Sequence, residues 1–265
     1  GSITNIPAIK LANIANSKRI NHFERNGAYV YAANDFSIVL IDAAKDEIKD
    51  TYYPTNGLEP IMDVAISQDS IFALTPSQMF KGLRSNPALP DYSQWDRDIR
   101  FPFQLTNKYA ELQQIGQQFW VLRKDETYGQ DSVFRLVNDQ LQLVTDQPFS
   151  LEINSIQAIG NQMAVSTDGG FMLYNADAQW QTAYSSNLLD RWLNTSRVCY
   201  IKNAFWGADK AWGLQEHINE YSCKRYLIEG LANRYVYAMD WQKGVLAVSS
   251  GRLEAEIAPA FTRNG

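Results

Sequence analysis

The chain has 265 residues, of which 45% are hydrophobic and 12% aromatic, enough to build the buried core of one large or two small domains. Its 24 basic and 29 acidic residues leave a formal net charge of −5, which argues against a protein that binds phosphate backbones along much of its surface. No apolar run approaches the ~20 residues that a membrane-spanning helix needs. We therefore expect neither a nucleic-acid partner nor a transmembrane segment in this chain.

The repeat pattern predicts the fold. Short apolar and alternating runs bounded by Gly, Asn, Asp and Ser recur throughout, whereas helical periodicity is never sustained. An apolar or aromatic pair follows a polar turn six times, at Val30-Tyr31, Ile71-Phe72, Phe119-Trp120, Met163-Ala164, Phe205-Trp206 and Val245-Leu246. The first members of these pairs are 41, 48, 44, 42 and 40 residues apart, which is the period of a propeller blade rather than of a helical solenoid. The sequence therefore predicts an all-β fold, a β-propeller of about six (five to seven) four-stranded antiparallel blades, forming a complete or an incomplete ring.

In chain order, the expected blades cover residues 16–60, 61–107, 108–155, 156–196, 197–233 and 234–265 of a single propeller domain taken from a larger multidomain protein. The fourth unit turns at Asp168-Gly169-Gly170, a hairpin signal, because glycine accepts the positive φ that a tight turn demands. The last unit reaches Gly265 after about one hairpin. Either an N-terminal strand around Leu11–Ile14 completes that blade, or the chain is a fragment.

Two long connections interrupt the repeat and are the expected binding region. The segment Gly82–Thr106 is rich in proline and bulky aromatic residues, and the third unit carries an insertion, Lys124–Asp131. Long loops on a rigid scaffold often carry function, and Trp, Tyr and Arg suit sugar rings, anionic groups and protein interfaces. The expected binding residues are Tyr92, Trp95, Arg97, Arg100 and Tyr128. In the alternative interpretation the aromatic residues cap the gap between neighbouring blades, and Trp95 belongs to the core.

Catalytic motifs are absent from the sequence. It contains no HExxH, GxSxG, GxGxxG or P-loop pattern, and its two histidines, His22 and His217, leave little room for His-based catalysis. Cys199 and Cys223 are too few for a Cys/His zinc site; two free thiols are the favoured interpretation, with a disulfide as the alternative. We expect no enzyme activity, no cofactor and no metal. A propeller glycosidase that uses paired carboxylates is the least favoured alternative.

Several stretches resemble the N-terminal propeller of PorZ-like proteins. They are Lys18–His22, Ala28-Tyr29, Asp35–Asp42, Glu47–Tyr53 and the Leu-x-Asp-x-x-x-Trp-like segment Leu89–Trp95. The resemblance is specific over roughly residues 10 to 95. The chain departs from the family at Ser37 and at Thr75-Pro76-Ser77-Gln78, so two turns must be built differently.

The resemblance implies a role outside the cytoplasm. PorZ-like proteins are accessory components of the type IX secretion system and act with the sortase that attaches cargo to surface lipopolysaccharide. The expected function is thus a non-catalytic binding or scaffold propeller, periplasmic or at the cell surface, whose partners are other cell-envelope proteins or surface polysaccharide. The alternative is a periplasmic ligand-sensing propeller of a hybrid two-component regulator, whose repeats have a similar length.

Overall fold

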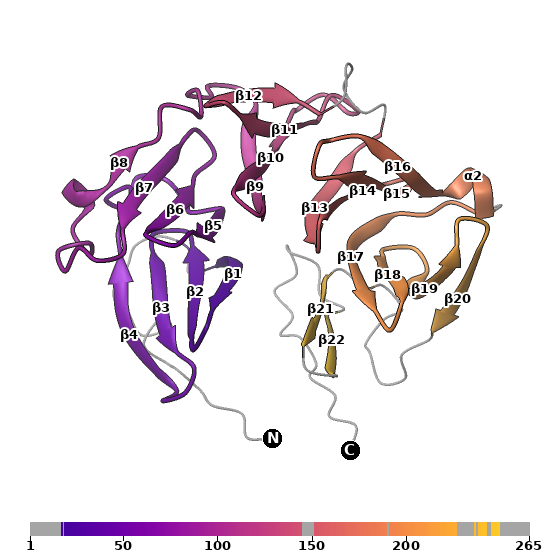
Figure 1. Cartoon of the computed structure of the whole chain (residues 1–265), viewed down its shortest axis with the longest axis horizontal. Helices are drawn as coiled ribbons and strands as arrows, with labels where there is room; N and C mark the ends of the chain where they lie inside the picture. The colour runs from indigo at the N-terminus through magenta and orange to yellow at the C-terminus, as the bar shows by residue number, and fades with distance from the viewer. Residues whose placement is uncertain are drawn as a thin grey trace. The chain divides into compact units, whose positions relative to one another are not determined.

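The computed structural model describes residues 17, 19–144, 151–189, 191–226, 236, 238–242 and 245–249. This part of the chain forms 22 strands, the 3₁₀ helix η1 (Tyr92–Gln94) and the four-residue helix α2 (Ser186–Leu189). Figure 1 shows the strands gathered into successive small sheets. The fold is all-β, as the sequence predicted. Within the described residues, no helix has the length and apolar character required to cross a membrane.

The first of two compact units comprises the residues up to Glu126 together with Val133–Leu143. It contains three four-stranded antiparallel sheets, each a meander whose strands lie side by side in chain order. Their strands are β1 (Ile20–Asn26), β2 (Tyr29–Asn34), β3 (Ile38–Asp42) and β4 (Glu47–Tyr52); β5 (Asp63–Ile66), β6 (Ser70–Leu74), β7 (Met79–Leu83) and β8 (Asp96–Arg97); and β9 (Lys108–Ile115), β10 (Gln118–Lys124), β11 (Ser132–Val137) and β12 (Gln140–Leu143).

The second unit comprises Thr127–Ser132 and the residues from Val144 on. Its two four-stranded meanders and one two-stranded sheet contain β13 (Ile153–Ile159), β14 (Gln162–Thr167), β15 (Gly170–Asn175) and β16 (Trp180–Ser185); β17 (Thr195–Ile201), β18 (Ala204–Asp209), β19 (Gly213–Asn219) and β20 (Ser222–Tyr226); and β21 (Ala238–Gln242) with β22 (Val245–Ser249). The described residues thus form five full blades and a small sixth one. The strand expected around Leu11–Ile14 lies outside them.

The sequence repeat reappears as hydrogen bonds between neighbouring blades. The side-chain amide of Asn21 donates to the carbonyl of Ile61 at 2.9 Å, and that of Asn154 donates to the carbonyl of Thr195 at 2.8 Å. These partners are 40 and 41 residues apart in the chain, so each bond connects equivalent edges of successive blades. Five of the six repeated pairs also begin at the second residue of the second strand of a blade; in the sixth, Val245 is the first residue of β22.

In four blades, the turn from the second to the third strand is closed by a side chain at the end of the second strand or directly after it. The residues are Asn34, Thr75, Thr167 and Asp209; each accepts hydrogen bonds from backbone N–H groups of its turn. Asn34 and Thr75 stand at the two turns that we expected from the sequence to be built differently, around Ser37 and Thr75-Pro76-Ser77-Gln78. A side-chain oxygen there satisfies the turn's backbone donors, the usual function of an Asx or ST turn.

Tight backbone packing explains one glycine of the Asp-Gly-Gly turn. Asp168 and Gly169 form the loop between β14 and β15, which confirms the hairpin. The positive φ, however, lies at Gly170 (124°) rather than at Gly169. A Cβ atom at position 170 would lie 2.0 Å from the carbonyl oxygen of Tyr184, so glycine is required by the approach of β16.

The hydrophobic core lies between successive blades. One cluster joins Tyr31, Ile38 and Leu40 of the first blade to Ile61, Ile71, Leu89 and Trp95 of the second. A second cluster joins the second and third blades, and a third joins the blades of β13–β16 and β17–β20. Within each unit, neighbouring blades thus bury apolar faces against each other, as the repeat predicts. Cys199 and Cys223 are not joined in a disulfide, which confirms the favoured interpretation.

Candidate functional site

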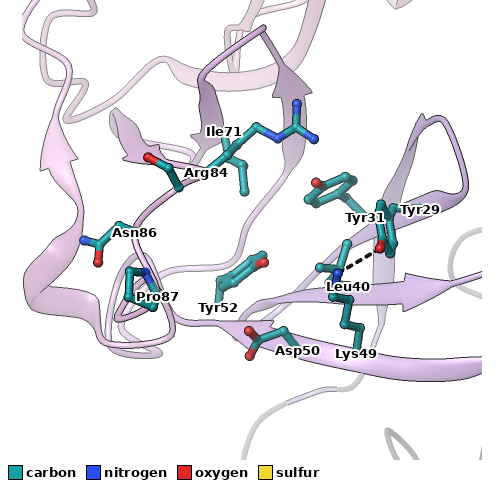
Figure 2. Close-up of a pocket in the computed structure, with 11 residues that line it drawn as sticks. Tyr29, Tyr31, Leu40, Lys49, Asp50, Tyr52, Ile71, Arg84, Asn86 and Pro87 are labelled. Carbon is teal, nitrogen blue, oxygen red and sulfur yellow. Dashed lines mark hydrogen bonds between the residues drawn. The ribbon is translucent and has the colours of Figure 1, made fainter.

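A pocket of about 240 Å³ opens between the first and second blades of the first unit. Its lining comprises Tyr29, Tyr31, Leu40, Lys49, Asp50, Tyr52, Ile71, Arg84, Ser85, Asn86 and Pro87. Figure 2 shows the segment after β7, with Arg84 and Pro87, facing Tyr29 and Lys49 across the pocket. Pockets for drug-sized ligands have volumes of roughly 300–1,000 Å³, so this one fits a single residue of a polymer, such as one sugar ring or one side chain.

The charged groups of this pocket are held in place by hydrogen bonds. The ammonium group of Lys49 donates to the Tyr29 hydroxyl at 2.8 Å and lies 4.2 Å from the centre of its ring; the hydrogen bond raises the pKa of Lys49. Arg84 donates to the carbonyl of Gln68 at 3.3 Å. Burial, followed by the charge of Asp50, raises the pKa of Tyr52 to about 12, so its hydroxyl stays protonated at neutral pH. Two cations and three phenol rings line the pocket together with a single carboxylate, a set that suits polar or anionic ligands with a flat apolar face.

A second, more open hollow of about 520 Å³ contains two of the expected binding residues. Arg97 and Arg100 line it with Lys81, Asp96, Asp98, Ile99 and Asp139. Asp98 accepts from Arg100 at 2.6 Å and Asp139 does so at 3.4 Å, which raises the pKa of the guanidinium. Arg97 lies over the ring of Phe103, 5.4 Å from its centre, and forms no ion pair in the described residues. Ile99 is 87% exposed beside them.

The remaining residues of the expected site have different environments. Tyr92, on η1, is 52% exposed, whereas Trp95 is 6% exposed and belongs to the core between the first two blades. The Trp95 indole donates to the carbonyl of Leu89 at 2.9 Å, and Gly82 leaves the space that its ring fills. The burial of Trp95 agrees with the alternative interpretation of a blade cap. Its ring therefore offers little surface to a ligand.

Tyr128 belongs to the second unit. Its side chain is 60% exposed, and its hydroxyl donates to Asp168 at 2.5 Å, a hydrogen bond that raises the pKa of the phenol. The structure thus brings Arg97 and Arg100 together around one hollow and places Tyr128 in another unit. In the described part of the chain, no group of three His, Cys, Asp or Glu side chains is arranged to hold a metal ion.

Sequence reasoning missed the pocket between the first two blades. Tyr29 and Tyr31 alternate along β2 and therefore share a face, a signal visible in the sequence. Lys49 on β4 and Arg84 beyond β7 reach the same place through sheet pairing and blade packing. No local pattern joins these residues, since their meeting depends on the tertiary structure.

Comparison with known proteins agrees with this fold. Residues 1–96 match the family model described as the N-terminal β-propeller domain of PorZ, and that segment contains all the residues of the first pocket. No curated protein sequence matches the chain. The structure of PorZ, described as an essential surface component of the type IX secretion system of Porphyromonas gingivalis, superposes with a TM-score of 0.64 at 17% identity, covering 94% of this chain and 32% of PorZ.

Two further structures share the fold. The extracellular domain of a putative hybrid two-component system from B. thetaiotaomicron has a TM-score of 0.61 at 14% identity and covers 86% of this chain and 30% of its own. A luciferin-regenerating enzyme has a TM-score of 0.58 at 7% identity, covering 89% of this chain and 85% of the enzyme. The chain spans about a third of the length of PorZ. It is a β-propeller whose first 96 residues resemble the N-terminal propeller of PorZ, as the sequence predicted.

Proposed function

We propose that this chain is a non-catalytic binding propeller of a cell-envelope secretion and surface-attachment assembly and works outside the cytoplasm. The observation that carries the proposal is the match of residues 1–96 to the N-terminal propeller domain of PorZ. Its partners are other cell-envelope proteins or surface polysaccharide.

The two hollows of the first unit supply binding chemistry. The pocket between the first two blades combines the Tyr29 and Tyr31 rings with the cations Lys49 and Arg84, and its size suits one residue of a polysaccharide or peptide. The larger hollow offers Arg97 and an exposed Ile99, features of a protein-binding surface. We assign the polymer residue to the pocket and a protein partner to the hollow.

Carboxylate placement favours binding over hydrolysis. Asp50 is the one carboxylate that lines the pocket, whereas glycoside hydrolysis uses a pair about 5–10 Å apart. The hollow is lined by three carboxylates, of which Asp98 and Asp139 both hold Arg100 and the third is Asp96. The propeller enzyme among the similar structures makes turnover worth measuring. A screen with aryl glycosides, esters and phosphates is expected to show none; turnover abolished by Asp50→Asn would refute the non-catalytic assignment.

A binding titration tests the pocket. Purified surface polysaccharide and single envelope proteins are titrated against wild type, Lys49→Met/Arg84→Met and Arg97→Met. Lys45→Met is the control for loss of a positive charge at an exposed side chain, because it removes one such charge from the turn between β3 and β4, outside both hollows. We expect at least a tenfold loss of polysaccharide affinity in the double variant and none in Lys45→Met. Equal affinity of all four proteins would remove both hollows from the binding site.

A ligand-sensing propeller is the second candidate. The similarity to the extracellular domain of a putative hybrid two-component system favours it. Sequencing the complete gene distinguishes the two functions. A transmembrane helix and a kinase domain after the propeller would support the sensor, whereas a C-terminal sorting domain would support secretion.

A further inference from the structure

A cluster of polar side chains lies on one face of the β17–β20 blade, in the second unit and apart from the two hollows above. Gln215 and His217 alternate along β19 and share this face. Cys223 on β20 is the cross-strand partner of His217, and its thiol donates to the Gln215 side-chain carbonyl at 3.4 Å. Arg191, which follows α2, reaches the same place, because its side chain hydrogen-bonds Cys223. Figure 1 shows β18, β19 and β20 side by side in this blade.

Three buried nitrogen atoms of this cluster have no hydrogen-bond partner. They are Nε of Arg191, Nε2 of Gln215 and Nδ1 of His217. Gln215 and His217 are almost completely buried, with 1% and 2% exposure. An unpaired buried polar group costs about 1–3 kcal/mol, so three of them in one cluster indicate a missing acceptor.

The charge of Arg191 is also uncompensated at close range. Arg191 forms no ion pair within the described residues. Asp209 is the carboxylate that interacts with it at longer range, but its oxygens accept backbone N–H groups of Asn194, Ala211 and Trp212 at 2.7–2.8 Å. A second guanidinium lies nearby, because Arg225 on β20 is the cross-strand partner of Gln215.

The walls of the cluster limit the access of water. The His217 ring meets Phe171 and Tyr184 edge to face, with centroids 5.0 and 5.2 Å apart. Burial, followed by the charge of Arg191, lowers the pKa of His217 to about 4, so the ring is neutral at pH 7. A neutral imidazole can present an N–H donor at Nδ1. The cluster thus contains two unpaired N–H donors, on Arg191 and Gln215, and a third where the His217 proton is on Nδ1.

We propose that Arg191, Gln215 and His217 form a binding site for a small oxyanion, such as a phosphate or carboxylate group. A water molecule would pair the free donors but leave the guanidinium charge without a counter-ion. An oxyanion does both, and charge-assisted hydrogen bonds are about twice as strong as neutral ones. This site is independent of the binding function proposed for the first unit.

Alkylation of Cys223 tests the proposal in the Cys199→Ser background, where Cys223 is the remaining one of the two cysteines. The rate of reaction with iodoacetamide and the melting temperature are measured at increasing concentrations of inorganic phosphate or acetate. Sodium chloride at matched ionic strength is the control. At ten times its Kd, an anion occupies about nine tenths of the sites. Since alkylation of Cys223 is expected to proceed from the unoccupied tenth, its rate should fall about tenfold. The melting temperature is expected to rise with the same saturation curve.

Three variants identify the site. Arg191→Met is expected to abolish both effects, and Gln215→Met to weaken them while relieving an unpaired donor. Lys224→Met is the matched control: its exposed charge lies on the same strand, between Cys223 and Arg225, and points to the opposite face. A response to phosphate or to acetate supports the site and identifies the geometry of the anion. No saturable response of the parent protein to either anion, a response equal to that of chloride, or an undiminished response of Arg191→Met overturns it.

Discussion

Replacing Trp95 by alanine tests whether the long loop of the second blade is core or binding surface. The side chain is 94% buried, packs in the cluster between the first two blades, and lies 6.3 Å from Tyr52 between ring centroids. A buried tryptophan removes roughly 200 Å² from water, which at about 25 cal/mol per Å² corresponds to about 5 kcal/mol. The substitution also removes the donor of the 2.9 Å bond to Leu89. Partial relaxation of the cavity reduces the expected loss of unfolding free energy to about 3–5 kcal/mol.

Urea denaturation of purified wild type and Trp95→Ala measures this loss. Tyr92→Ala is the matched control, since it removes an exposed ring from the same loop and is expected to change stability by no more than about 0.5 kcal/mol. The reasoning predicts that Trp95→Ala loses binding only to the extent that it unfolds. A folded Trp95→Ala protein with wild-type stability and reduced affinity for polysaccharide or partner would refute it, and would return Trp95 to the binding site.

Three further predictions concern stability. Gly170→Ala places a Cβ atom 2.0 Å from the Tyr184 carbonyl oxygen at a φ of 124°, so it is expected to destabilise the protein by more than 2 kcal/mol (~1–3 for the backbone strain plus the displacement of β16); a normal urea midpoint would contradict this. Burial raises the pKa of Asp63 to about 6, so its stabilising contribution is present below about pH 4 and is lost as pH rises through 6. The change is about 3 kcal/mol, and Asp63→Asn should remove it from the pH profile of unfolding. Burial lowers the pKa of His217 to about 4, so its contribution is present above about pH 6.5 and is lost as pH falls through 4. The change in unfolding free energy is again about 3 kcal/mol, with the opposite dependence on pH. In His217→Phe, the pH profile of unfolding should therefore show the Asp63 contribution alone. Identical profiles for wild type, Asp63→Asn and His217→Phe would show that neither group titrates as described.

The sequence by itself determined the all-β class and the blade repeat. Alternation of apolar residues defines strands, and a polar turn followed by an apolar pair marks the second strand of each blade. The predicted period of 40 to 48 residues returns in the structure as hydrogen bonds such as Asn21 to Ile61 and Asn154 to Thr195. These features are local or periodic, and a single chain displays them without an alignment.

The tertiary structure decided which side chains are available for binding. Trp95 and Arg97 are two residues apart, yet Trp95 packs over Gly82 in the core, whereas Arg97 lines an open hollow. Composition predicted both as binding residues, because Trp and Arg are common at interfaces. The burial of a loop side chain depends on how the neighbouring blade packs against it, and the sequence of the loop does not show that packing.

The same reason explains the two sites that the sequence did not reveal. Lys49 and Arg84 face one pocket, although 35 residues separate them in the chain. Arg191 meets Cys223 and His217 only because a loop folds onto a face of the next blade. Strand patterns specify which face of a sheet a residue occupies, but the packing of blades and loops decides what that face meets.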